Sequence, residues 1–141
     1  MDSKEIDYWT RQAKETAGDI IRDPKKSAKE DIPNTEVIVL IGGTQERTDY
    51  FSELLQAEIK KKGREPEIRR EIMFSETVSL TSQDGVYPSI KELIDFRTPD
   101  ILTIVMDPEG LFAKDPHYQS LERRVYSIDM TVLGGEVPGE E

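Results

Sequence analysis

The sequence predicts an α/β fold with three layers, built on a mostly parallel four-stranded sheet of flavodoxin-like or Rossmann-like type, with an additional N-terminal amphipathic helix. Two aliphatic runs, at residues 37–41 and 101–106, each lead into a glycine-containing turn, as buried strands of parallel sheets do. Segments with helical spacing of apolar residues lie between the predicted strands, which is typical of βα units. A chain of 141 residues is expected to form one main domain.

Residues 1–24 are predicted to form the amphipathic helix. Its apolar residues recur every three or four positions and are Ile6, Trp9, Ala13, Ala17 and Ile20. Residues 25–35 are polar and charged and have the composition of a linker to the α/β domain at 36–133. Two uses of the stripe therefore stay open: it packs into the core of its own chain, or it docks on a protein partner. The partner-binding candidates are Ile6, Trp9, Ala13 and Ile20.

The four predicted strands differ in their expected burial. The runs at 37–41 and 101–106 are apolar almost throughout, so they are expected in the middle of the sheet. The segments at 67–74 and 125–133 alternate apolar and polar residues, as edge strands with one solvated face do. This pattern predicts the strand order 2-1-3-4. The last strand can be parallel or antiparallel, and residues 78–80 either extend the second strand or form a short one.

Helices are expected between the strands. Thr48 is a candidate N-cap for a helix that stops at Gly63, and Ser89 with Glu92 forms a capping box for the next helix. Asp115, followed by proline, starts a short helix to about residue 123. Right-handed crossovers place the first of these helices on one face and the two shorter ones on the other. The glycine-rich, acidic residues 134–141 are predicted to be disordered.

Composition and charge exclude several classes of function. The chain has no cysteine, so disulfides, thiolate catalysis and cysteine-bound metals are excluded. Its formal net charge of -10 disfavours nucleic-acid binding, which needs a positive surface. The first residues are rich in charge and hold no apolar stretch for a signal peptide or a membrane span, so a cytoplasmic protein that does not bind membranes is expected.

The predicted ligand position is the crevice between the first and third strands. In open α/β sheets ligands bind at the carboxyl ends of strands, where the chain reverses its direction across the sheet. The candidate ligand-binding residues are Gly42, Gly43, Thr44, Thr48, Asp107 and Gly110. Backbone N–H groups and hydroxyls there would suit a phosphate, and Asp107 is the candidate ligand for Mg²⁺.

A purely architectural interpretation of the same residues stays open. The glycines would then form a tight strand-to-helix turn, and Asp107 would start a turn with Pro108. The turn lacks the complete dinucleotide fingerprint and the complete Walker sequence. Acidic residues around the crevice would repel a bare anion unless a divalent metal bridged it; they are Glu46, Asp49, Asp107 and Glu109, with Arg47 as the nearest cation.

Residues 99–110 resemble the phosphoacceptor strand of response-regulator receiver domains, because an apolar strand leads there into an aspartate and a proline-glycine turn. The resemblance implies an acyl-phosphate acceptor at Asp107. Receivers also carry an acidic pair at the end of the first strand, where this chain has Ile41, Gly42 and Gly43. They also need a lysine after a fifth strand, which is not predicted here. Phosphotransfer is therefore not expected.

Two further features have simple interpretations. His117, the one histidine, is expected on the surface of a short helix. The basic cluster at residues 60–70 complements a helix C-terminus and continues into an edge strand.

Two hypotheses of function follow from these patterns. The first is a non-catalytic domain that binds a protein partner or a second copy of itself, through the N-terminal helix or an edge strand. The alternative is a domain that binds a nucleotide or phosphorylated metabolite, with or without Mg²⁺, in the crevice at Gly42 to Thr44. No complete catalytic signature is present, so we expect ligand binding without catalysis under the second hypothesis, and enzyme activity is its less favoured form.

Overall fold

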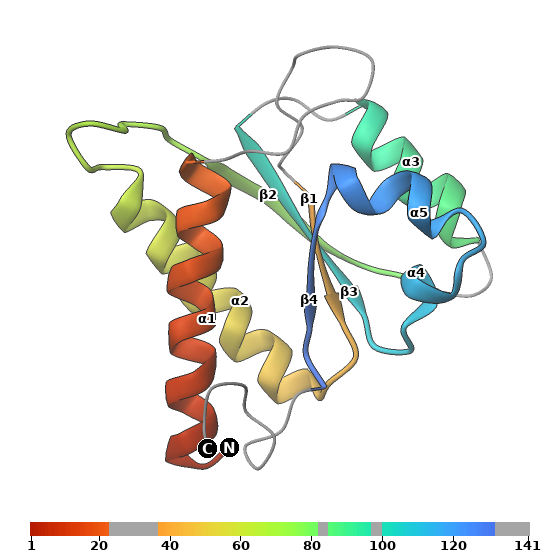
Figure 1. The fold of residues 1–141 in the computed structure, drawn as a ribbon, viewed down its shortest axis with the longest axis horizontal. Coiled ribbons are helices and arrows are strands. Elements are labelled where there is room, and N and C mark those ends of the chain that lie inside the picture. The colour runs from red at the N-terminus through yellow and green to blue at the C-terminus, as the bar shows by residue number, and fades with distance from the viewer. Residues whose placement is uncertain (23–36, 82–84, 97–99, 132–141) are drawn as a thin grey trace.

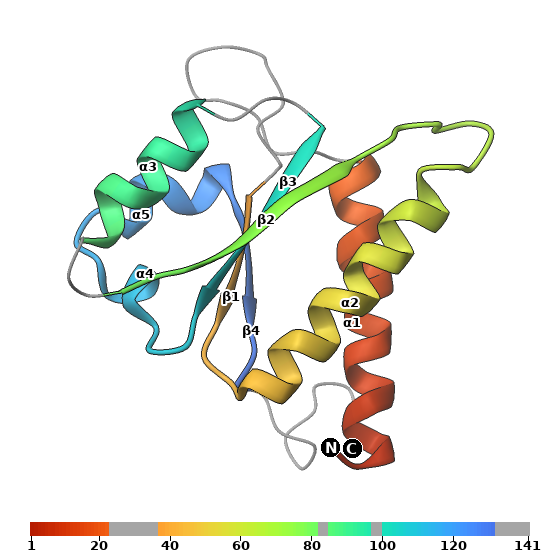
Figure 2. The same ribbon diagram turned by 180° about the vertical axis from the view of Figure 1, so that it is seen from behind.

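The computed structural model describes residues 1–22, 37–81, 85–96 and 100–131 and has three layers (Figure 1). A parallel four-stranded sheet forms the middle layer, with α1 and α2 on one face and α3, α4 and α5 on the other, as Figures 1 and 2 show. The strands are β1 (Val37–Ile41), β2 (Met73–Ser79), β3 (Ile101–Asp107) and β4 (Tyr126–Asp129). The predicted linker and acidic tail lie outside the described residues.

The predicted fold class is confirmed, but the predicted position of the two edge strands is wrong. The order is β2-β3-β1-β4, so β1 and β3 are the central pair while β2 and β4 have exchanged sides relative to the order 2-1-3-4. Both orders place the connecting helices on the same faces with right-handed crossovers, so neither handedness nor burial separates them. The β4 strand is parallel to β1, which settles the alternative left open by its sequence.

The central strands divide the core into two parts. Ile38, Leu40 and Ile104 pack toward α1 and α2, whereas Val37 and Val39 pack toward the helices on the other face. All of these side chains are almost completely buried. Unbroken aliphatic runs are therefore required here, because successive side chains of a strand point to opposite faces and both faces are covered.

Helix α1 (Ser3–Arg22) lies within the predicted residues 1–24 and packs against α2 (Gln45–Lys62). Trp9, Ala13 and Ile20 are fully buried, and Trp9 meets Phe51 of α2 edge to face at 5.6 Å. Ile6 is partly buried. The structure thus shows the stripe inside the core of its own chain, where a partner would have to displace the helix to reach it.

Two helix starts differ from the prediction because other groups cap them. The N-cap of α2 is Thr44, not Thr48, and its side chain accepts a hydrogen bond from Arg47 N at 3.1 Å. Helix α3 (Val86–Phe96) begins before Ser89, so the predicted capping box is not its start. Instead the carboxylate of Asp115 accepts a hydrogen bond from Tyr87 N at 2.9 Å. A contact between residues distant in sequence replaces the local cap.

The segment after α2 also differs from the prediction. Residues 67–72, whose apolar and polar side chains alternate, do not form a strand. Turns follow Gly63, and Arg69 has a positive φ of 43°. The strand β2 begins at Met73 and runs into the residues whose extension was left open. The helix predicted from Asp115 is shorter, as α5 (Tyr118–Leu121) followed by the 3-10 helix η1 (Glu122–Arg124). An additional short helix, α4 (Leu111–Lys114), precedes it, and Asp115 is the C-cap of α4.

We predict that Trp9→Ala destabilises the protein by about 3–5 kcal/mol, because it removes the largest buried side chain between α1 and the sheet. The measurement is urea unfolding followed by circular dichroism. The control Lys14→Ala, on the exposed face of the same helix, should change stability by no more than about 0.5 kcal/mol. Equal effects of the two substitutions would contradict the packing of α1 described above.

Candidate functional site

The carboxyl ends of β1 and β3 meet at the predicted crevice. The chain leaves β1 toward α2 on one face and β3 toward α4 on the other, so this is the point where the direction across the sheet reverses. A small hollow lies there. Its lining includes five of the six predicted ligand-binding residues, namely Gly42, Gly43, Thr44, Thr48 and Asp107, and Gly110 is outside it.

Asp107 is completely buried, and all of its described hydrogen bonds are to the backbone. Its carboxylate oxygens accept hydrogen bonds from Leu111 N at 2.7 Å and Phe112 N at 2.8 Å, so the side chain holds the start of α4. Its carbonyl accepts from Gly42 N at 2.7 Å and Gly110 N at 3.2 Å, and the second bond closes the predicted turn that starts at Asp107 and continues with Pro108. The carboxylate therefore has a structural use. Within the described residues no group of three or more His, Asp or Glu side chains could hold a metal ion.

The glycine turn is closed by the end of β4. Gly42 and Gly43 have φ values of 75° and 78°, which favour glycine. A Cβ atom at Gly43 would lie 2.7 Å from the carbonyl oxygen of Met130, too close for a side chain. The hydroxyl of Thr44 accepts from Arg47 N, and that of Thr48 donates to the Thr44 carbonyl at 2.8 Å. These candidate phosphate-binding groups are thus used within the turn and the helix start.

The size of the hollow decides what it can hold. Its volume is about 20 Å³. A water molecule needs roughly 10–15 Å³ measured in this way, and pockets for small organic ligands measure about 300–1,000 Å³. The hollow therefore admits one water molecule, and a nucleotide or a phosphorylated metabolite would require β4 or the glycine turn to move.

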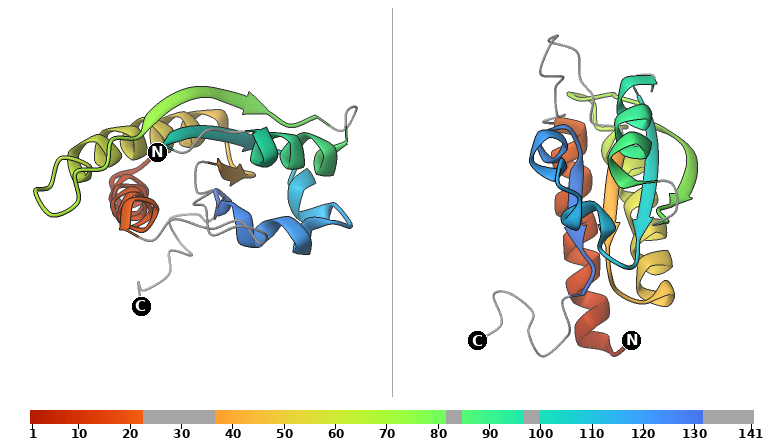
Figure 3. Two further views of the ribbon diagram at one scale, coloured as in Figure 1. Left: turned by 90° about the horizontal axis from the view of Figure 1, so that it is seen from above. Right: turned by 90° about the vertical axis from the view of Figure 1, so that its right-hand side faces the viewer.

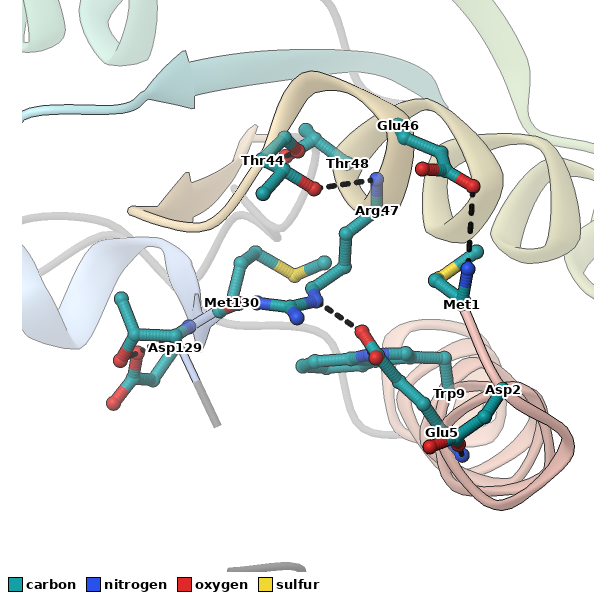
Figure 4. A network of polar contacts seen from close by, with 11 residues as sticks. Met1, Asp2, Glu5, Trp9, Thr44, Glu46, Arg47, Thr48, Asp129 and Met130 are labelled. Atoms are coloured by element: carbon teal, nitrogen blue, oxygen red, sulfur yellow. Dashed lines mark hydrogen bonds and ion pairs between the residues drawn. The ribbon is translucent and has the colours of Figure 1, made fainter. Parts of the chain in front are cut away.

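A buried polar network lies directly beside the turn (Figure 4). The Arg47 guanidinium donates through Nε to Glu5 of α1 and through Nη1 to the carbonyl of Met130 at 2.7 Å. The indole Nε1 of Trp9 donates to the same carboxylate oxygen at 3.2 Å, and the guanidinium carbon lies 6.0 Å from the centre of the Trp9 ring. The cation nearest to the crevice is thus paired with Glu5 and unavailable to an anionic ligand.

Glu5 and Arg47 are both buried, with 8% and 6% of their surface exposed. The hydrogen bond from Arg47 is the main cause that lowers the pKa of Glu5 below its ordinary value of 4.5, and the bond from Trp9 acts in the same direction. Burial opposes this shift because it disfavours the charged carboxylate. The carboxylate therefore stays ionised in the folded protein at pH values where it would be protonated in the unfolded chain.

A larger cavity, of about 190 Å³, lies between the end of α2 and the start of β2. Its lining is Ile59, Lys60, Gly63, Arg64, Arg70, Glu71, Ile72 and Met73. Ile59 and Ile72 are buried, while Lys60 and Arg64 are exposed. Arg70 is held in position by Asp100 at 2.7 Å and by the carbonyl of Ile20 at 3.0 Å. The cavity thus has an apolar floor and a mainly basic rim.

This cavity continues into the open edge of the sheet. β2 is an outer strand that pairs with β3 alone among the described residues, and both panels of Figure 3 show it at the margin of the sheet. Met73, its first residue, lines the cavity and is 69% exposed. Leu80 N donates to Met106 of β3, so by the two-residue alternation of a strand the N–H groups of Thr77 and Ser79 point away from β3.

Comparisons of the chain with protein-family models, with curated proteins and with solved structures give no significant match. No helix in the described parts of the chain has the length and apolar character needed to cross a membrane. The assignment of function therefore depends on the physical features of the two cavities and the sheet edge.

The sequence predicted the crevice but indicated neither the ion pair beside it nor the cavity at the other end of α2. The pairing of Glu5 with Arg47 joins residues 42 positions apart, and no local pattern indicates it. The cavity beside β2 forms where a helix end meets a strand start, and its one sequence signal is the basic cluster at residues 60–70. His117 is exposed as predicted, with its ring centroid 4.2 Å from that of Tyr87.

We predict that Gly43→Ala destabilises the protein more than Gly110→Ala does. Both positions have a positive φ, which costs a residue with a side chain about 1–2 kcal/mol. At Gly110 the nearest atom to an added Cβ is 3.8 Å away, whereas Gly43 adds an overlap with Met130 that costs about 1–3 kcal/mol more. Thermal unfolding of the two variants measures the difference. Equal losses would show that β4 does not close over the turn in solution.

We also predict that Glu5→Gln lowers stability at neutral pH by about 3–5 kcal/mol, because it leaves the buried charge of Arg47 without a compensating carboxylate. The lowered pKa of Glu5 makes its contribution fully present above 4.5 and lost as the pH falls through the folded value. The wild type and the variant should therefore converge in stability below pH 4.5, as measured by urea unfolding from pH 7 to 3. A constant difference over that range would refute a charged Glu5 in the pair.

Proposed function

We propose that this protein is a non-catalytic interaction module that binds an extended segment of a partner protein along the outer edge of β2. The observation that supports this most directly is the open edge itself, which continues into a cavity of about 190 Å³ at its start. A strand edge binds a peptide through backbone hydrogen bonds, and an adjacent cavity accepts a side chain. Both elements are needed for recognition by strand addition.

The edge at β2 offers more to a partner than the edge at β4. β2 has seven residues, and β4 has four. The side chain of Tyr126 in β4 also bonds to the carbonyl of Asp19 in α1 at 3.1 Å, which connects that edge to a helix. The exposed thioether of Met73 adds an adaptable apolar contact of the kind found on peptide-binding surfaces.

The charge of the protein favours a different protein over a second copy of this chain. Its net charge of -10 makes two copies repel each other. The partner is therefore expected to be another protein, and we expect the encounter in the cytoplasm, in keeping with a chain that has no cysteine.

Binding of a nucleotide or phosphorylated metabolite in the crevice at Gly42 to Thr44 is the weaker proposal. The turn lies at the position where open α/β sheets bind ligands. However, the hollow holds about 20 Å³, the carboxylate of Asp107 bonds to two backbone N–H groups, and Arg47 is paired with Glu5. A ligand there would have to break contacts that hold the fold together.

We predict that selection of random linear peptides on the purified protein enriches binders, and that Ser79→Pro weakens their binding at least tenfold. Proline removes an N–H that points away from β3 and blocks a strand on that side, while the sheet keeps its own bonds. Ser79→Ala, which keeps the N–H, is the matched control. Fluorescence anisotropy of the enriched peptides measures affinity, and thermal unfolding verifies that both variants fold. Selection without enriched peptides, or equal affinity for the two variants, would overturn the proposal.

A further inference from the structure

We propose that the partner segment is acidic and that one of its carboxylate side chains enters the cavity between the end of α2 and the start of β2. This inference rests on the proposed binding at the β2 edge and specifies the chemistry of the partner. The geometry that carries it is the direct continuity between the edge and the cavity, since Met73 is the first residue of the strand and also lines the cavity.

The charge at the cavity is opposite to that of the protein as a whole. The lining holds three cations, Lys60, Arg64 and Arg70, and one anion, Glu71, in a chain with a net charge of -10. Arg70 is ion-paired with Asp100, while Lys60 and Arg64 are exposed at the rim. Lys61 and Arg69 are exposed beside them in sequence. An acidic segment is attracted to this end of the edge and repelled by the acidic remainder of the surface, which favours binding of its acidic residue at the cavity.

The size of the cavity fits one side chain. A cavity of about 150 Å³ binds benzene, and pockets for small organic ligands begin near 300 Å³. A volume of about 190 Å³ therefore admits a glutamate or aspartate side chain, with its methylene groups against Ile59 and Ile72 and its carboxylate toward Lys60 and Arg64. The ion pair with Asp100 and the bond to the Ile20 carbonyl hold Arg70 at the cavity before a partner binds. This reduces the ordering that binding requires.

The same features disfavour a nucleic acid as the occupant. A nucleic acid needs a row of cations along its backbone, and here acidic residues interrupt the basic cluster at Glu65, Glu67 and Glu71. No pair of exposed aromatic rings lies beside the cations within the described residues that line the cavity. A peptide needs only one or two charges at a single position, together with backbone groups along the edge.

The experiment analyses the composition of the peptides selected on the wild type. We expect enrichment of glutamate or aspartate at one fixed position, followed by residues that alternate as in a strand. The double variant Lys60→Glu with Arg64→Glu should bind these peptides at least tenfold more weakly in fluorescence anisotropy. The control double variant Arg11→Glu with Lys14→Glu changes the net charge equally on the exposed face of α1 and should keep the affinity within about twofold.

The outcomes separate the two proposals. Enriched peptides that are sensitive to Ser79→Pro but have no acidic preference would overturn the acidic segment and leave binding at the β2 edge intact. Equal losses in the two charge variants would show general attraction and would also overturn it. Peptides that respond to the Lys60 and Arg64 changes but not to Ser79→Pro would show an anion site without strand addition. Displacement of the peptides by a single-stranded RNA oligonucleotide at lower concentration would favour a nucleic acid instead.

Discussion

The buried charge of Arg47 is the constraint on which much of this structure depends. A guanidinium with 6% of its surface exposed must be paired, and here its partners come from distant parts of the chain: the carboxylate of Glu5 on α1 and the carbonyl of Met130 after β4. Breaking such a pair leaves an uncompensated buried charge, which costs about 3–5 kcal/mol. The requirement therefore holds α1 against α2 and brings the end of β4 over the glycine turn.

The same pairing reduces the space available for a ligand in the crevice at the carboxyl end of the sheet. In many parallel sheets this position is an open ligand site, because loops after adjacent strands diverge there. In this protein the end of β4 contacts Gly43, and the side chain of Asp107 bonds to the start of α4. The hollow that remains has a volume of about 20 Å³. The two glycines and Asp107 thus connect the ends of β1 and β3 to the helices that follow them.

We propose that recognition takes place at the other end of α2, beside the outer edge of β2. The helix ends at Gly63, the chain turns, and β2 begins with an exposed methionine beside a cavity of about 190 Å³. In the proposed binding, the backbone of the edge strand would provide affinity without particular side-chain chemistry, and the cations at the cavity would provide selectivity by charge.

The sequence by itself determined the elements whose signals are local. Helix α1 and the central strands β1 and β3 were predicted within two residues at each end, because the spacing of their apolar residues follows the period of a helix or forms an unbroken buried run. The crevice followed from placing the two buried strands side by side with a glycine turn after each, and the wrong positions of the edge strands do not affect it. Tertiary structure alone decided which edge strand pairs with β1, since both arrangements satisfy the same burial and handedness. It also decided the cap of α3 by Asp115, the start of β2 and the pairing of Arg47 with Glu5. Each of these depends on contacts between residues far apart in the chain, whose energies no local pattern contains.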